Sequence, residues 1–224
     1  MRMAELSKST GIPVATIKFY LRGGLLQPGE RTGPNQADYD ASHVERLGLI
    51  RTLRDIGDLS ISTIKTIVDA IENSSTVQLV TAVADALNSS ETVGELNDRE
   101  RETYERAARD IDTFLRKRHW YIRPDSPVRR RLVDALVALQ GSSFVGITAE
   151  SFGPYADAVE PLARKELSHT VAVAGRGKAT QIVETMVEGT LLWERALVAL
   201  RRAAEEHAAT EQAIRAGLMR PPGA

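Results

Sequence analysis

The chain contains no cysteine, few aromatic residues and almost no net charge. Its 224 residues include no Cys, 5% Phe, Trp and Tyr together, and a formal charge of −1 at pH 7. The absence of thiols excludes disulfides and a redox thiol switch. No apolar run reaches transmembrane length and no signal peptide is recognisable, so we expect a cytoplasmic protein that does not contact a membrane. A net charge near zero provides no global attraction to nucleic acid.

Two short helical patterns separated by a glycine open the chain. Residues 4–9 form the first pattern, which ends at Thr10-Gly11, and residues 14–22 form the second. The second pattern keeps an apolar edge made by Val14, Ile17 and Leu21, and its donor side chains lie off that edge. Two short helices joined by a tight Gly-containing turn are typical of a helix-turn-helix that binds duplex DNA.

A turn-rich segment and two further helical patterns follow. Pro, Gly and Asn punctuate residues 28–40, which predicts a β-turn between two very short strands, in other words a wing. Ser42 and Glu45 have the spacing of a capping box that opens a third helix, which runs as far as Gly57. A fourth helix is predicted from a cap near Ser60, with isoleucines along one face. The order of these elements predicts a small winged-helix domain.

Several short sequence pieces in residues 2–71 occur in a fixed order and spacing: Ala4-Glu5-Leu6, Thr10-Gly11-Ile12, Phe19-Tyr20, Gly24-Leu25-Leu26 with Pro28, Arg31-Thr32, Tyr39-Asp40, Arg46-Leu47, Ile50-Arg51 and Leu53-Arg54. In these pieces the segment resembles the N-terminal DNA-binding domain of MerR-type transcription regulators. The resemblance implies a homodimer that binds a pseudo-palindromic operator within a promoter. It further implies that the dimer distorts the DNA so that RNA polymerase can use the promoter, and that the C-terminal part receives a signal.

The chain also departs from the family pattern. The family usually has an arginine where this chain has Ala15, a glutamate where it has Leu21, and Gly-Tyr-Arg in the wing where it has Asn35-Gln36-Ala37. One expected phosphate contact is therefore missing, and the operator sequence of other members is not expected to carry over. The lack of cysteine removes the ligands on which metal-sensing members rely, so we expect no metal and no cofactor.

The second helix, the wing and the start of the fourth helix carry the predicted DNA contacts. Residues 1–36 hold five basic side chains against two acidic ones, which suits a salt-dependent contribution to DNA binding. The expected base contacts are Thr16 and Lys18. The expected phosphate contacts, which are cationic or hydroxylated, are Tyr20, Arg22, Arg31, Ser60, Ser62 and Lys65. Tyr39 is expected to anchor the wing to the core.

Residues 98–120 predict a charged helix with a narrow apolar seam. Acid-before-base pairs four residues apart favour an exposed helix. The seam residues follow a four-three-four spacing and are Tyr104, Ala108, Ile111 and Leu115. We predict that this helix pairs with its copy in a homodimer; the alternative is an amphipathic helix packed on its own chain. The basic cluster of residues 116–131 is interpreted as a helix end, a proline turn and a new helix start, not as a second nucleic-acid surface.

The remaining residues predict helices separated by short breaks, and strand-like alternation is nearly absent. We therefore predict a mainly α protein with a winged helix-turn-helix domain over residues 1–75, a linker or short helix over 76–97, the dimerisation helix over 98–120 and an all-helical effector or oligomerisation region over 121–224. On the last long helix, Met186 and Trp193 lie on an apolar stripe beside Glu194. This predicts a site for a small hydrophobic cation, with plain core as the alternative.

Two other classes of protein compete with a regulator. An enzyme would need a nucleophile with a base, paired carboxylates in a cleft or a cofactor fingerprint, and none stands out, so we expect no enzymatic activity. A helical adaptor would use the winged domain to bind protein instead of DNA, and the sequence leaves this alternative open.

Overall fold

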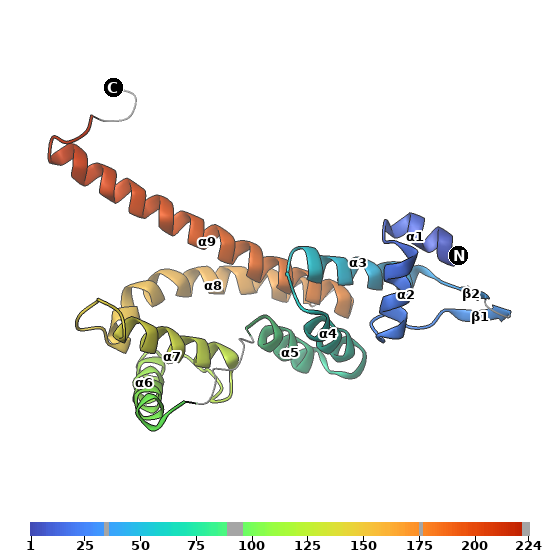
Figure 1. The fold of residues 1–224 in the computed structure, drawn as a ribbon, viewed down its shortest axis with the longest axis horizontal. Coiled ribbons are helices and arrows are strands. Elements are labelled where there is room, and N and C mark those ends of the chain that lie inside the picture. The colour runs from blue at the N-terminus through green and yellow to red at the C-terminus, as the bar shows by residue number, and fades with distance from the viewer. Residues whose placement is uncertain (34–35, 89–95, 175–176, 221–224) are drawn as a thin grey trace.

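The computed structural model describes residues 1–33, 36–88, 96–174 and 177–220, and it confirms a mainly helical chain with a small two-stranded wing (Figure 1). The N-terminal elements are α1 (Met3–Thr10), α2 (Val14–Arg22), β1 (Glu30–Gly33), β2 (Gln36–Asp38), α3 (Ala41–Asp55), α4 (Ile61–Asn73) and α5 (Thr76–Asn88). The C-terminal elements are α6 (Asp98–Lys117), α7 (Pro127–Gln140), the 3₁₀ turn η1 (Ala149–Phe152), α8 (Gly153–Ala174) and α9 (Ala179–Arg215).

A tight turn at Gly11 separates α1 from α2. Gly11 has a φ of 71°, a left-handed conformation that glycine adopts without steric cost, and its N–H donates to the Ser7 carbonyl at 2.9 Å. Pro13 then precedes α2 and cannot continue a helix from the preceding turn. These residues explain why the chain stops and restarts as two short helices, as the sequence predicted.

The wing is an antiparallel pair tied to the N-terminus. Glu30 lies opposite Asp38, and Arg31 lies opposite Ala37. The predicted turn residue Asn35 lies outside the described residues. The terminal ammonium of Met1 donates to the Tyr39 carbonyl at 2.7 Å, and the Tyr39 N–H donates back to the Met1 carbonyl at 2.8 Å. The wing is therefore fixed at its base by the first residue of the chain.

The cap of α3 differs from the prediction. The capping box expected at Ser42 and Glu45 is wrong, because α3 begins at Ala41 and its N-cap is Asp40. One carboxylate oxygen of Asp40 accepts from the backbone N–H of Ser42 at 2.9 Å and from that of His43 at 3.4 Å. Hydrogen bonds from the side chains of Ser42 and His43 hold the pKa of Asp40 well below its usual range.

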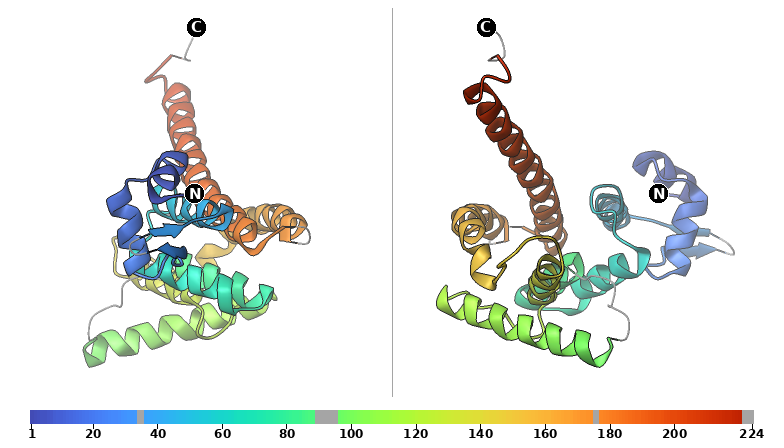
Figure 2. Two further views of the ribbon diagram at one scale, coloured as in Figure 1. Left: turned by 90° about the vertical axis from the view of Figure 1, so that its right-hand side faces the viewer. Right: turned by 60° about the vertical axis from the view of Figure 1, so that its left-hand side comes forward.

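One apolar core joins the helix-turn-helix to α5 and to the beginning of α9. It contains Leu6, Ile17, Leu47, Ile50, Ile64, Ile67, Leu79, Val83, Val183 and Val187 among its buried members. Figures 1 and 2 show α9 starting beside α3 and α5. The edge of this core therefore does not coincide with the domain boundary predicted at residue 75, and α5 is a packed helix.

A second core is formed by α6, α7, η1 and the start of α8. Ile111 and Leu115 are buried in it, and Tyr104 and Ala108 pack against it from the same helix. All four residues of the predicted dimerisation seam are therefore covered by their own chain. This packing agrees with the alternative of an amphipathic helix packed on its own chain, and the pairing of two copies through this seam stays a prediction.

Helix α9 is the longest element, with 37 residues, and its C-terminal half projects away from both cores (Figure 1). From Leu192 onward nearly every described residue of α9 is exposed. In the described part of the chain, no helix has the length and apolar character needed to cross a membrane.

Candidate nucleic-acid interface

The exposed side of α2 carries the predicted base contacts. Ile17 is fully buried and fixes the helix on the core, while Lys18 is exposed and Thr16 is half-buried. Arg22, at the last position of α2, is exposed as well. The helix therefore presents a hydroxyl and two cations away from the core, as docking in a major groove requires.

Tyr20 does not belong to this exposed side, contrary to the sequence prediction. It is only 3% exposed, lies in the first core and accepts a hydrogen bond on its hydroxyl from Nη1 of Arg54 at 3.4 Å. Tyr20 lies one turn beyond Ile17 on α2, so both residues point into the core. The neighbouring Phe19 is 44% exposed, so Phe19 and not Tyr20 is the aromatic residue on the solvent side of α2.

Three exposed cations, on α2 and in the wing, have no ion-pair partner among the described residues. Within the described residues, Lys18, Arg22 and Arg31 make no ion pair, whereas Arg2, Arg46 and Lys65 of the same domain pair with Asp38, Glu72 and Asp69. An unpaired guanidinium or ammonium can meet a phosphate without first breaking an ion pair.

The start of α4 lies beside the end of α2. A Cβ built on Gly24 would meet Cε of Lys65 at 3.4 Å, which places Lys65 against the turn that follows α2. Ser60 caps α4, since its hydroxyl accepts from the Thr63 N–H at 3.1 Å and lies 2.8 Å from the Ser62 hydroxyl. Lys65 is held by Asp69, so its charge is partly neutralised.

Tyr39 links the wing to α3. It is 7% exposed, directly follows β2, and packs edge-on against the His43 ring with the ring centroids 5.1 Å apart. Burial raises the pKa of the Tyr39 hydroxyl. Arg2, which the sequence analysis did not single out, adds a second link because its Nη1 donates to the Thr32 hydroxyl of β1 at 2.7 Å.

The basic cluster of residues 116–131 is largely neutralised inside the protein. Arg129 donates to both carboxylate oxygens of Asp112 at 2.7 and 2.8 Å, and its guanidinium lowers the pKa of Asp112. Arg123 donates to both oxygens of Asp85 at 2.6 and 2.7 Å, which ties α5 to the turn before α7. Arg118 pairs with Asp157. These cations hold helices together, as expected for a cluster that is not a second nucleic-acid surface.

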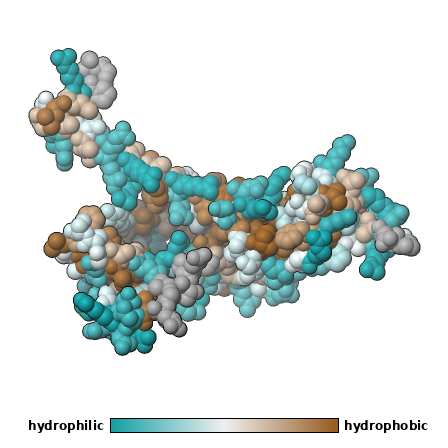
Figure 3. Space-filling model, in the orientation of Figure 1, coloured by the Kyte–Doolittle hydropathy of each residue, from teal (hydrophilic) through white to brown (hydrophobic). Residues whose placement is uncertain are grey.

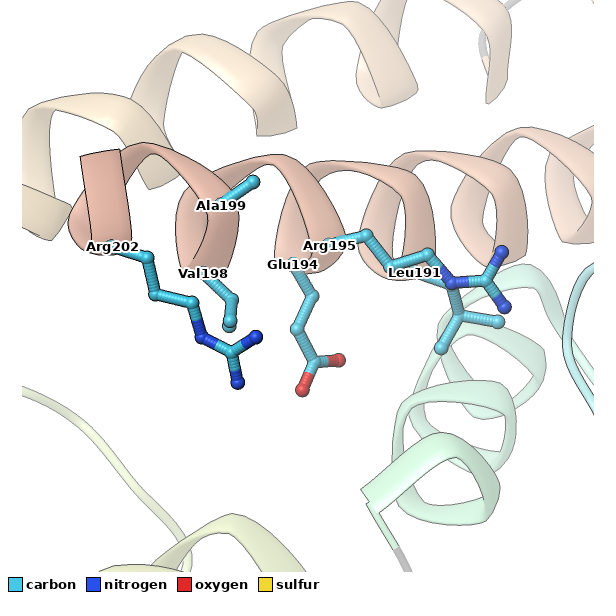
Figure 4. A pocket seen from close by; sticks show the side chains of 6 residues that line it. All are labelled: Leu191, Glu194, Arg195, Val198, Ala199 and Arg202. Atoms are coloured by element: carbon cyan, nitrogen blue, oxygen red, sulfur yellow. The ribbon is translucent and has the colours of Figure 1, made fainter.

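The structure does not bring the three predicted effector residues together. Glu194 lines an open hollow of about 430 Å³ on one side of α9, together with Leu191, Arg195, Val198, Ala199 and Arg202 (Figure 4). Met186 packs against the first core and Trp193 is 57% exposed outside the hollow. Two guanidinium groups outnumber one carboxylate, so the charge of the hollow favours an anionic ligand over the cation predicted from the sequence. No cluster of His, Asp and Glu that could hold a metal ion occurs in the described residues.

Comparisons with known proteins agree with the geometry of the N-terminal part. Residues 1–71 match the model of the MerR HTH family regulatory protein. An HTH-type transcriptional regulator ZntR homolog from Haemophilus influenzae is 37% identical over 78 residues, which are 35% of this chain and 56% of that protein. Nodulation protein NolA from Bradyrhizobium elkanii is 41% identical over 56 residues, 25% of this chain and 26% of that protein. The matches thus span about half or less of these two relatives.

One solved structure resembles the whole chain. SCO5550 from Streptomyces coelicolor A3(2), a proposed transcriptional regulator, superposes with a TM-score of 0.65 at 29% sequence identity, and the match covers 99% of this chain and all of that chain. The likeness therefore extends through the helices beyond residue 71. Residues 1–71 of the chain are therefore a MerR-type helix-turn-helix domain.

Proposed function

We propose that this protein is a sequence-specific transcription regulator that binds a pseudo-palindromic promoter operator as a homodimer. The observation that carries the proposal is the exposed side of α2, where Lys18 and Arg22 make no ion pair with any described residue and Ile17 fixes the helix to the core. A two-fold operator follows from two copies that each insert one α2 into the major groove. RNA polymerase is then affected through the shape of the promoter DNA.

Each named side chain has a separate task in this proposal. Lys18 and Thr16 meet base edges or lie next to them, while Arg22 and Arg31 neutralise phosphates on either side. The capped start of α4, with Ser60 and Ser62, offers hydroxyls and backbone donors to a further phosphate. Ile17 of α2 and Ile64 of α4 are buried in the same core, which keeps α4 at a fixed position relative to α2.

The hollow on α9 is the surface that we propose for a small-molecule signal. Arg195, which lines it, donates from Nη2 to the Ile56 carbonyl at the C-terminal end of α3 at 2.9 Å. An anionic ligand that drew Arg195 into the hollow would break this hydrogen bond to the DNA-binding part. The ligand would then bind the conformation without the hydrogen bond more tightly than the conformation with it, and so shift the equilibrium between the two.

Binding to DNA tests the proposal directly. Selection from a pool of randomised duplexes by the full chain, followed by mobility shift with and without heparin, is expected to yield an inverted repeat that is retained in competition. The helical-adaptor alternative predicts no enriched sequence and no retention even at low salt, and that result would overturn the proposal.

Two single substitutions separate reading of bases from phosphate binding. Lys18→Ala is expected to weaken operator binding and to relax the preference between operator variants. Arg31→Ala is expected to weaken binding to all duplexes similarly and to reduce the slope of log K against log salt by about 1. Arg99→Ala, an exposed arginine of α6, is the matched control and should bind like the parent. If the Lys18 and Arg31 variants also bind like the parent, α2 and the wing do not dock as proposed.

A further inference from the structure

Two apolar residues stand at the centre of the outward side of α2. Successive helix residues are about 100° apart, so Phe19 lies almost opposite the buried Ile17, and Ala15 lies one turn before Phe19 on the same side. Phe19 is 44% exposed, and Ala15 is exposed as well. The proposed base contacts Thr16 and Lys18 therefore flank an apolar centre that none of the proposed DNA contacts uses. Figure 3 shows hydrophilic and hydrophobic residues intermixed over the end of the molecule that carries α1 and α2.

The Phe19 ring is supported from the protein side. Its centroid lies 5.9 Å from that of the Tyr20 ring, with the two planes tilted by 56°, which is a favourable separation for an aromatic pair. Tyr20 is buried in the first core, and its hydroxyl accepts from Arg54 at 3.4 Å. The Phe19 ring therefore has a fixed neighbour on one side, and its exposed part points away from the core.

A ring without donors or acceptors has one apolar partner among the base edges of the major groove. Thymine presents a C5-methyl group there, whereas the other three bases present only hydrogen-bonding groups. A polar base edge placed against the Phe19 ring would lose its hydrogen bonds to water and form no new ones. A thymine methyl group loses no hydrogen bond and buries apolar surface together with the ring. The small side chain of Ala15 leaves room for the methyl group beside the ring.

We propose that Phe19, together with Ala15, contacts the C5-methyl group of a thymine and so sets a preference for thymine at one position in each half-site of the operator. The inference rests on the proposed function, because it needs α2 in the major groove, and it adds the base that one side chain selects. Lys18 and Arg22 act through charge, so their contribution to DNA binding falls with salt concentration. The contribution of Phe19 is apolar and does not.

Removal of a single methyl group tests the contact. The probe is the duplex that the full chain selects, in which each thymine of the half-sites is replaced in turn by deoxyuridine at the matching position of both half-sites. Deoxyuridine keeps the pairing edge of thymine and lacks only its methyl group. For the parent, replacement at one position is expected to raise the dissociation constant by about fourfold for each half-site, the effect of burying one such group.

Variants of Phe19 assign the effect to the ring. Phe19→Ala is expected to bind the thymine and deoxyuridine duplexes equally and more weakly than the parent binds the thymine duplex, with the slope of log K against log salt unchanged. Phe19→Leu keeps an apolar side chain and is expected to retain part of the preference. Phe144→Ala is the matched control: Phe144 follows α7, is 64% exposed, and its loss should leave the preference at the parent value. Thermal midpoints check that each variant is folded.

The outcomes separate this contact from DNA binding itself. A selected operator whose half-sites contain no thymine, or a parent that binds every deoxyuridine duplex like the thymine duplex, overturns the contact and leaves the regulator standing. A folded Phe19→Ala variant that keeps the parent's preference for the methyl group overturns the contact as well. A parent that selects no duplex overturns the regulator and the contact together.

Discussion

At the scale of single residues, the wing depends on the absence of a side chain at Gly29. A Cβ at this position would lie 2.5 Å from the Asp38 carbonyl oxygen and 2.9 Å from Cε1 of Tyr39. Gly29→Ala is therefore expected to displace β2, lower the thermal midpoint and weaken DNA binding. Gly48→Ala is the control: nothing lies within 4 Å of its Cβ, so it should stabilise α3 by about 0.5–1 kcal/mol. Equal midpoints for the two variants would contradict this account of the wing.

The cap of α3 predicts a pH dependence at the same scale. The pKa of Asp40 is lowered in the folded protein, so its contribution to stability is present above the ordinary carboxyl pKa and is lost as the pH falls through the lowered value. Asp40→Ala is expected to lower the urea midpoint at neutral pH, and the difference from the parent should shrink as the solution is acidified. Asp110→Ala, which removes an exposed acid of α6, should show no such convergence.

At the scale of elements, the apolar side of α6 is buried within its own chain. Ile111 is completely buried against α7 and η1, so Ile111→Ala is expected to cost about 2–4 kcal/mol of unfolding free energy and to leave the sedimentation behaviour of the native protein unchanged. Urea unfolding measures the first quantity. A variant that dissociates a dimer without loss of stability would identify α6 as an intermolecular helix.

Local signals in the sequence predicted the helices but not all of their partners. The stop at Gly11, the apolar spacing of α2 and the Pro and Gly of the wing act over a few residues, and these elements were predicted correctly. The seam of α6 was recognised, yet a four-three spacing describes a buried face without telling whose chain buries it. Tyr20 was misplaced because a nine-residue helix docks by a wider face than its aliphatic residues indicate.

At the scale of the whole molecule, the first core joins the beginning of α9 to the helix-turn-helix. Val183 and Val187 are fully buried with Leu47 and Ile50, and Nζ of Lys178 lies 2.8 Å from Oε1 of Glu45 in α3. Contacts between residues some 130 positions apart leave no local pattern, so the sequence could not reveal them.

This packing predicts a distant effect of substitution. Val187→Ala is expected to speed hydrogen exchange of the backbone amides of α3 and α4, because a cavity in the shared core destabilises both. Val198→Ala, at an exposed position of α9, should leave these amides unchanged. Unchanged exchange in the Val187 variant would show that α9 and the helix-turn-helix unfold independently.

Because α9 is one continuous helix, the rotation of its distal half relative to its buried half is fixed. A helix turns by about 100° and advances about 1.5 Å with every residue, so one extra alanine after Thr190 would rotate the distal half against the anchored half, while seven extra residues would nearly preserve the phase. If two copies pair through the distal halves of α9, the length and pitch of this helix set the spacing and the angle between the two recognition helices on the duplex.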